Sequence, residues 1–191
     1  RGLGDVYKRQ TYIQTVYNRE NGLPGGCAND IAQTADGILW IGTYGGLYRY
    51  NGNEFQWMDG FESVKTVNCL YTDEEGRLWI GTNDSGLSIC INETITNVVS
   101  EKDGLTADSV RCITQSSDGD YYVGTSGAMS ILTLAGGLSV KDTIPEIIYA
   151  NSIDSDQNGN IAVVTDEGKL YLIRGKEILA EPVSYTHLRA H

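Results

Sequence analysis

The sequence predicts an all-β fold, a β-propeller of four four-stranded blades, and three observations support this. A segment of eight residues recurs along the chain with a period near 40. Turn dipeptides such as Asp-Gly and Asn-Gly recur between short apolar runs, and glycine is frequent, at 23 of 191 residues. No window sustains the 3.6-residue apolar stripe of an amphipathic helix, which argues against helical repeats of similar length.

The recurring segment is clearest at residues 36–43, which read DGILWIGT. It returns at 75–82 as EGRLWIGT, and more weakly at 118–125 as DGDYYVGT and at 158–165 as NGNIAVVT. The closing threonines are separated by 39, 43 and 40 residues. Four strands of about 5–6 residues with their turns use about that length, so each repeat predicts one propeller blade.

The blades are predicted at about 22–60, 61–103, 104–141 and 142–181. Their strands are expected at 28–34, 38–43, 46–50 and 54–58, at 65–72, 77–82, 87–91 and 94–98, at 109–115, 121–125, 128–132 and 138–140, and at 148–153, 160–165, 170–174 and 177–180. One more strand is expected at 11–17. Because a blade buries its sheet faces only against its neighbours, Trp40, Trp79 and their equivalents Tyr122 and Ala162 are expected between blades.

The two ends do not fit the repeat. Residues 1–10 (RGLGDVYKRQ) and 183–191 (VSYTHLRAH) resemble translated sequencing adaptors, and we interpret both as artefactual sequence. The propeller is then expected over 11–182. Four blades cut at both ends would expose two sheet faces, so we expect them to belong to a larger ring.

Composition excludes several function classes. The formal net charge of −11 repels phosphate, so nucleic acid and anionic membrane are not expected partners. Both histidines, His187 and His191, lie in the discarded end, which leaves no imidazole for catalysis or zinc. The cysteines show no CxxC spacing. Cys69 and Cys112 occupy equivalent positions of neighbouring repeats, where buried free thiols are favoured and a disulfide stays open.

The motifs together resemble a known repeat. GLP at 22–24, LWIGT at 39–43 and GLYRYNG at 46–52 resemble the two-component regulator propeller repeat, and the second and third blades repeat parts of it. The resemblance implies a seven-bladed ring outside the membrane, ahead of a transmembrane segment and a histidine kinase or diguanylate cyclase. It leaves a homodimer of the full-length protein open.

Propeller ligands tend to bind at the central opening, on the face formed by the loops between the fourth and first strands and between the second and third. In this chain that face is expected to present Asn29, Tyr44, Asn83, Asp84 and Ser126. Aromatic and amide side chains suit sugars, through stacking and hydrogen bonds. We therefore expect a sensor module that binds an extracellular ligand such as an oligosaccharide, with the missing blades and signalling domains as its other partners.

Two other functions stay open. The first is a lyase or hydrolase that works through carboxylates and tyrosine, and the second is a scaffold for protein contacts. No catalytic residue, metal ligand or cofactor is assigned. The acidic run at 154–159 imitates a calcium loop, but Thr165 stands where the loop requires a glutamate.

Overall fold

The computed structural model describes residues 14–23 and 27–184, which form four antiparallel sheets of four strands each. A 3₁₀ turn, η1 (Arg19–Asn21), precedes them, and another, η2 (Glu101–Asp103), joins the second and third sheets. The strands of the first two blades are β1 (Ala28–Gln33), β2 (Leu39–Thr43), β3 (Gly46–Tyr50), β4 (Phe55–Trp57), β5 (Val67–Thr72), β6 (Leu78–Thr82), β7 (Leu87–Ile91) and β8 (Thr94–Val99). Those of the last two are β9 (Val110–Gln115), β10 (Tyr121–Thr125), β11 (Ala128–Thr133), β12 (Ser139–Ile148), β13 (Ala150–Ser155), β14 (Ile161–Thr165), β15 (Lys169–Arg174) and β16 (Glu177–Ser184).

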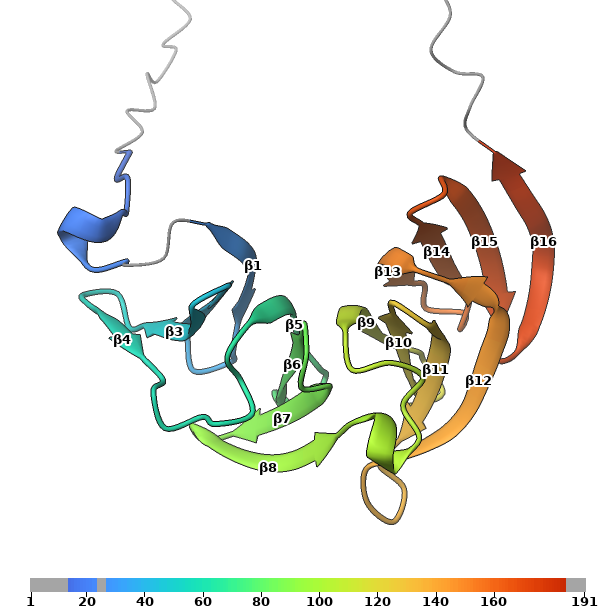
Figure 1. Cartoon of the computed structure of the whole chain (residues 1–191), viewed down its shortest axis with the longest axis horizontal. Coiled ribbons are helices and arrows are strands. Elements are labelled where there is room, and N and C mark those ends of the chain that lie inside the picture. Colours follow the sequence, from blue (N-terminus) through green and yellow to red (C-terminus); the bar gives the residue numbers. More distant parts are fainter. Residues whose placement is uncertain (1–13, 24–26, 185–191) are drawn as a thin grey trace, which may run out of the picture.

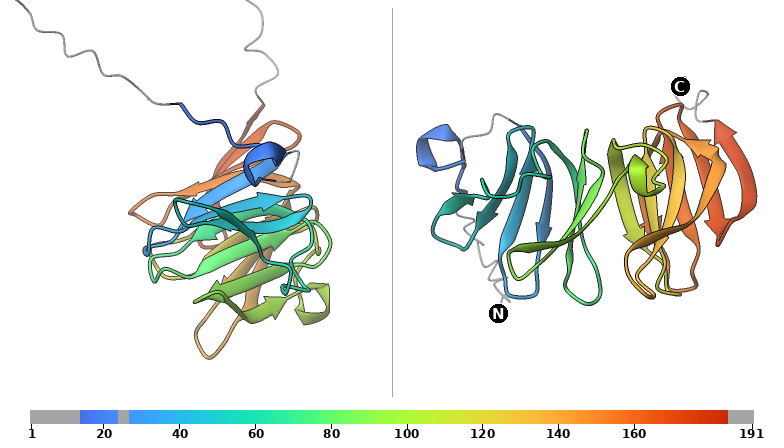
Figure 2. Two further views of the ribbon diagram at one scale, coloured as in Figure 1. Left: turned by 90° about the vertical axis from the view of Figure 1, so that its left-hand side faces the viewer. Right: turned by 60° about the horizontal axis from the view of Figure 1, so that its bottom comes forward.

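The four sheets stand side by side in an arc, as the blades of a propeller do (Figure 1). The strands β1, β5, β9 and β13 line its inner side, and β4, β8, β12 and β16 lie outermost. Seen from the side, each blade is a twisted sheet that runs from one face of the arc to the other (Figure 2). The predicted fold of four four-stranded blades is confirmed.

The core of the molecule lies between blades. One apolar cluster joins the first and second blades through Trp40, Leu70 and Leu78. A second joins the next pair, with the Trp79 ring stacked on Tyr121 at a centroid distance of 3.9 Å and an interplanar angle of 26°. A third surrounds Tyr122 between the last two blades. The prediction that Trp40, Trp79 and Tyr122 pack between blades is confirmed, whereas Ala162 faces away from the third blade and is half-buried.

The glycine of the repeat allows this close packing. A Cβ atom built on Gly42 would lie 2.4 Å from Val67 Cγ1, and one on Gly81 would lie 2.6 Å from Val110 Cγ1. One on Gly124 would lie 2.7 Å from the Cβ of Ala150. In each case the contact is with the first residue of the next blade's inner strand, so the backbone itself is the contact surface there.

A buried carboxylate ties the second blade to the third. The Asp73 side chain has no exposed surface and accepts hydrogen bonds from Trp79 Nε1 at 2.8 Å, Arg77 Nε at 2.6 Å and Tyr121 OH at 3.0 Å. Burial alone would raise the pKa of Asp73, but these donors outweigh it and the pKa is lowered. Asp73 therefore stays ionised although it is buried, because the protein donors replace the water that its carboxylate has lost.

Several elements differ from the predicted ones. The strand expected at 11–17 is wrong for residues 14–17, which form none, while 11–13 lie outside the described residues. Strand β12 runs past the predicted blade boundary at residue 141 to Ile148, because a shift in its pairing with β11 leaves residues 145–147 without a partner and lets the strand continue. Strand β16 extends beyond Ala180 to pair Val183 with Leu170. Residues 1–10 and 185–191 lie outside the described residues.

All four cysteines are free thiols, and Cys69, Cys90 and Cys112 are buried. Burial raises the pKa of the Cys112 thiol to about 12 and that of Cys90 to about 11. The disulfide left open between Cys69 and Cys112 does not form. These two sulfurs instead fill the space beside Gly81 and Gly124, each 2.4 Å from where a Cβ would stand.

We expect Gly81→Ala to lower the free energy of unfolding by about 2–3 kcal/mol, because the new methyl group would overlap Cys69 and Val110. Urea denaturation measures this. Gly60→Ala is the matched control, since nothing lies within 4 Å of its Cβ, and it should change stability by less than about 0.5 kcal/mol. Equal effects of the two substitutions would contradict the seam role of Gly81.

We expect Asp73→Ala to destabilise the protein by about 2–3 kcal/mol at neutral pH, because Arg77 loses its buried partner and Trp79 its acceptor. The lowered pKa of Asp73 means that its contribution is present above the unfolded value of about 3.9 and is lost as pH falls through the folded value. The stability gap between wild type and variant should therefore close in acid. Glu75→Ala removes an ion pair that Arg77 makes at the surface and should have little effect.

Candidate functional site

A polar cavity of about 500 Å³ lies on the inner side of the arc. Its lining comes from all four blades: Ala28, Asn29, Tyr44, Asn68, Asn83, Ser109, Arg111 and Asn151. Four of these are the second residues of the innermost strands, namely Asn29 in β1, Asn68 in β5, Arg111 in β9 and Asn151 in β13. The repeat thus brings equivalent positions of every blade to one place.

A bulge in each inner strand places these side chains. In β1, Ala28 pairs with Thr43 and Asp30 with Gly42, so Asn29 has no partner in β2. The same shift in register leaves Asn68, Arg111 and Asn151 without a partner in the other three blades. A bulged residue leaves the alternation of the strand, and its side chain is redirected. The bulges therefore turn these four side chains toward the cavity.

The closing threonine of each repeat shapes the loops that supply the rest of the lining. Thr43 Oγ1 donates to the Gly46 carbonyl at 3.0 Å, and Thr82 Oγ1 donates to Gly86 at 2.8 Å. Both threonines are buried. They close the tight turns after β2 and β6, which carry Tyr44 and Asn83.

The asparagines also hold the seams. Asn29 Nδ2 donates to the Val67 carbonyl at 2.7 Å, and Asn68 Nδ2 donates to the Val110 carbonyl at 3.1 Å. Each amide thus satisfies a carbonyl of the next blade with its nitrogen, and its oxygen is an acceptor with two lone pairs. These residues belong to the seam and to the cavity at once.

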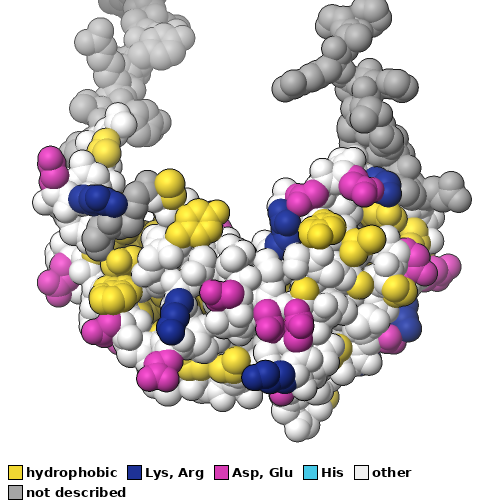
Figure 3. Space-filling view, viewed as in Figure 1, with side chains coloured by type: hydrophobic (Ala, Val, Ile, Leu, Met, Phe, Trp, Pro, Cys, Tyr) yellow, Lys and Arg dark blue, Asp and Glu magenta, His cyan; other side chains and the backbone are white. Residues whose placement is uncertain are grey.

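Arg111 brings the one cationic side chain among the eight lining residues. Its guanidinium contacts both Asp166 carboxylate oxygens, at 2.9 and 3.1 Å, and donates to Asn151 Oδ1 at 3.1 Å. Asp166 thus neutralises the Arg111 charge within the site. Over the whole face seen in Figure 3, acidic side chains outnumber basic ones. Paired in this way, Arg111 and Asp166 offer donors and acceptors side by side without a net charge.

Tyr149 stands next to this ion pair in a strained conformation. Its φ is +53°, which is uncommon for an aromatic residue, and its side chain is 49% exposed. Its backbone nitrogen donates to Gly127 at 3.2 Å, and its carbonyl accepts from the Asp166 nitrogen at 3.0 Å. Such outliers cluster at functional sites, and this one carries an exposed aromatic side chain on a backbone that is hydrogen-bonded to Asp166.

The structure brings together three of the five predicted site residues: Asn29, Tyr44 and Asn83 line the cavity. Asp84 and Ser126 do not. Asp84 is exposed and accepts from Ser85 Oγ at 2.9 Å, while the Ser126 backbone nitrogen donates to Ser109 at 2.9 Å. A role in binding stays a prediction for all five residues.

Sequence reasoning missed Asn68, Ser109, Arg111 and Asn151. A signal was present, because Ala28-Asn29, Val67-Asn68, Val110-Arg111 and Ala150-Asn151 occupy one register of the repeat. Extending the repeat alignment from the second strand into the first would have selected three of them. The bulge that exposes them has no sequence signal of its own.

The lining consists mainly of hydrogen-bonding side chains. Its eight residues comprise amides, a serine, a tyrosine, a guanidinium and an alanine, with no carboxylate or imidazole. Within residues 14–23 and 27–184, no cluster of three or more His, Cys, Asp or Glu side chains could hold a metal ion. No helix in the described part of the chain is long and apolar enough to span a membrane.

Comparison with solved structures shows the same fold in larger proteins. The extracellular domain of a putative hybrid two component system from B. thetaiotaomicron superposes with a TM-score of 0.67 and 17% identity, over 85% of this chain and 26% of that one. The chain therefore spans about a quarter of its length. A virginiamycin B lyase from Staphylococcus aureus gives 0.68 and 14%, over 86% and 59%. At such identities the likeness shows the fold alone.

No curated protein matches the chain. The model of the two component regulator propeller family matches residues 22–45, 62–84 and 104–127, which begin the first, second and third blades. The fourth blade, with Ala162 and Val164 in place of the aromatic residue and the glycine, is the divergent one. The resemblance seen in the sequence is confirmed, and the chain carries two component regulator propeller repeats in its first three blades.

Proposed function

We propose that these blades form part of the ligand-binding sensor region of a bacterial membrane signalling protein, and that the ligand is a glycan fragment or another small polyhydroxylated molecule. The observation that carries this is the convergence of Asn29, Asn68, Arg111 and Asn151 on one polar cavity. Amides and a paired guanidinium match the alternating donors and acceptors of neighbouring hydroxyl groups. The exposed ring of Tyr44 suits the apolar face of a sugar.

The family match and the likeness to an extracellular sensor domain support this proposal. They favour a location outside the cytoplasmic membrane, with the anchor and the output domain in parts of the protein other than these residues. We further propose that the blades are not catalytic. The likeness to a lyase raises the enzymatic alternative, but the lining holds no carboxylate or imidazole, and Tyr44 is its one side chain of a type that serves as a general acid or base.

Binding is tested by screening the purified chain against an array of oligosaccharides and measuring each hit by titration calorimetry. Binding without turnover is the expected result. Cleavage of a bound polysaccharide would favour a lyase or hydrolase, and a protein partner with no glycan binding would favour a scaffold. Either result would overturn the sensor proposal.

For a glycan that binds, we expect Tyr44→Ala to weaken the affinity by about tenfold, the loss of one stacking contact of about 1.4 kcal/mol. Stability should not change, because Tyr44 is 65% exposed. Trp57→Ala is the matched control, since this ring is 54% exposed but does not line the cavity, and it should leave the affinity unchanged. Equal losses for both variants would place the binding elsewhere.

A further inference from the structure

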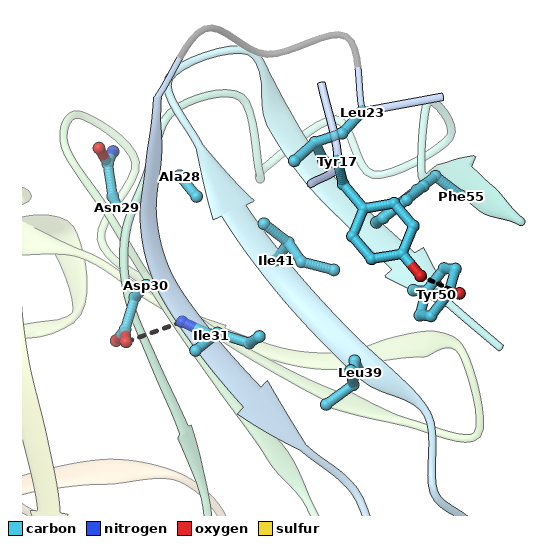
Figure 4. Close-up of a pocket in the computed structure, with 10 residues that line it drawn as sticks. All are labelled: Tyr17, Leu23, Ala28, Asn29, Asp30, Ile31, Leu39, Ile41, Tyr50 and Phe55. Carbon is cyan, nitrogen blue, oxygen red and sulfur yellow. Dashed lines mark hydrogen bonds between the residues drawn. The ribbon is translucent and has the colours of Figure 1, made fainter. Parts of the chain in front are cut away.

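The two ends of the arc each present a sheet face that contacts no other blade within the described residues. On the first blade, Ile31, Leu39 and Ile41 point to one side and line an apolar cavity of about 500 Å³ (Figure 4). Ile31 is 60% exposed. On the fourth blade, Val164 and Leu172 are 40% and 39% exposed on its outer face. The residues on each of these faces occupy the strand positions whose equivalents pack between blades at the internal seams.

Two positions define an internal seam. The first is the glycine at 42, 81 or 124, against which the first residue of the next inner strand packs with no room for a Cβ. The second lies two residues earlier and holds Trp40, Trp79 or Tyr122, a large ring that fills the space between the sheets. In all three seams, therefore, the first position holds a glycine and the second holds a large aromatic side chain.

The fourth blade inverts this rule. Val164 pairs with Ser152 in the register in which Gly42 pairs with Asp30, so it occupies the glycine position. Ala162 pairs with Leu172 as Trp40 pairs with Arg49, so it occupies the ring position. The outer face of this blade therefore carries the large Val164 where the other seams have glycine, and the small Ala162 where they have an aromatic ring.

The chain's own first blade does not fit such a face. It presents Ala28 at the position of Ala150, and a Cβ at the glycine position already stands 2.7 Å from the Cβ of Ala150. It presents Leu39 at the position of Leu78, which is matched to a tryptophan ring at the first seam. Docked on the fourth blade, Ala28 would overlap Val164 while Leu39 would leave a void over Ala162.

We propose that the outer face of the fourth blade is a docking surface for a β-blade of inverted shape, one with glycine opposite Val164 and a large apolar side chain opposite Ala162. Continuity with the three internal seams argues for a blade as the occupant, since the apolar face and its register are preserved. The inverted sizes exclude the first blade of a second copy, because one contact overlaps and the other is empty. Such a repulsive element is how one partner is chosen over a similar one.

The test gives the first blade the inverted shape. We expect wild type to be monomeric in analytical ultracentrifugation, and Ala28→Gly with Leu39→Trp to self-associate head to tail, tighter than wild type by about tenfold or more. The reciprocal pair, Ala162→Trp with Val164→Gly, restores the ordinary seam and should also associate. Combining all four substitutions sets ring against ring and glycine against glycine, and should return the monomer.

Adding Ile31→Asp to either associating pair controls for nonspecific contacts, and it should abolish association because the charge lies on the first-blade face. Circular dichroism and cooperative unfolding check that each variant folds. The proposal is overturned if wild type itself cross-links between its two end faces. It is also overturned if both pairs fold and stay monomeric, or if the fourfold variant associates as well as the pairs do.

Discussion

The structure depends on the approach of one blade's backbone to the side chains of the next. At Gly42, Gly81 and Gly124 the neighbouring strand lies so close that no Cβ can be accommodated. That approach sets the spacing of the blades, and the spacing decides which side chains fill the rest of each seam. Because each blade is stabilised only by its neighbours, a fault at one glycine would weaken two sheets at once.

The same spacing builds the cavity. Neighbouring inner strands stand close enough for Asn29 and Asn68 to donate to the carbonyls of the next blade, and the bulge in each strand turns the residue out of its sheet. Where an arginine replaces the asparagine, Asp166 and Asn151 hold it in place. The polar lining therefore follows from how the blades meet, because the same side chains that reach the next blade also line the cavity.

Much of this could be predicted from the sequence, since the repeat of LWIGT with its turn glycines carries strand order, turn positions and the buried face. The long β12 could not, because its extension rests on pairing with β11 rather than on a local pattern. Residues 14–17 read as a strand by composition, yet no strand pairs with them among the described residues. The lining of the cavity was predicted in part: loop residues such as Tyr44 follow visible turns, whereas Arg111 is exposed by a bulge.

The polar contacts that accompany the seams differ from one to the next. Trp40 Nε1 donates to Thr34 of its own blade at 3.0 Å, Trp79 shares Asp73 with Tyr121 of the next blade, and Tyr122 OH donates to the Gly175 carbonyl of the next blade at 3.2 Å. Near-identical repeats risk assembling in the wrong order, because an apolar face alone does not tell one blade from another. Asp73 of the second blade is such a distinguishing group, because it accepts a hydrogen bond from the Tyr121 hydroxyl of the third blade. A blade other than the third, packed against the second, would bury Asp73 without the Tyr121 hydroxyl, and that cost favours the second and third blades as neighbours.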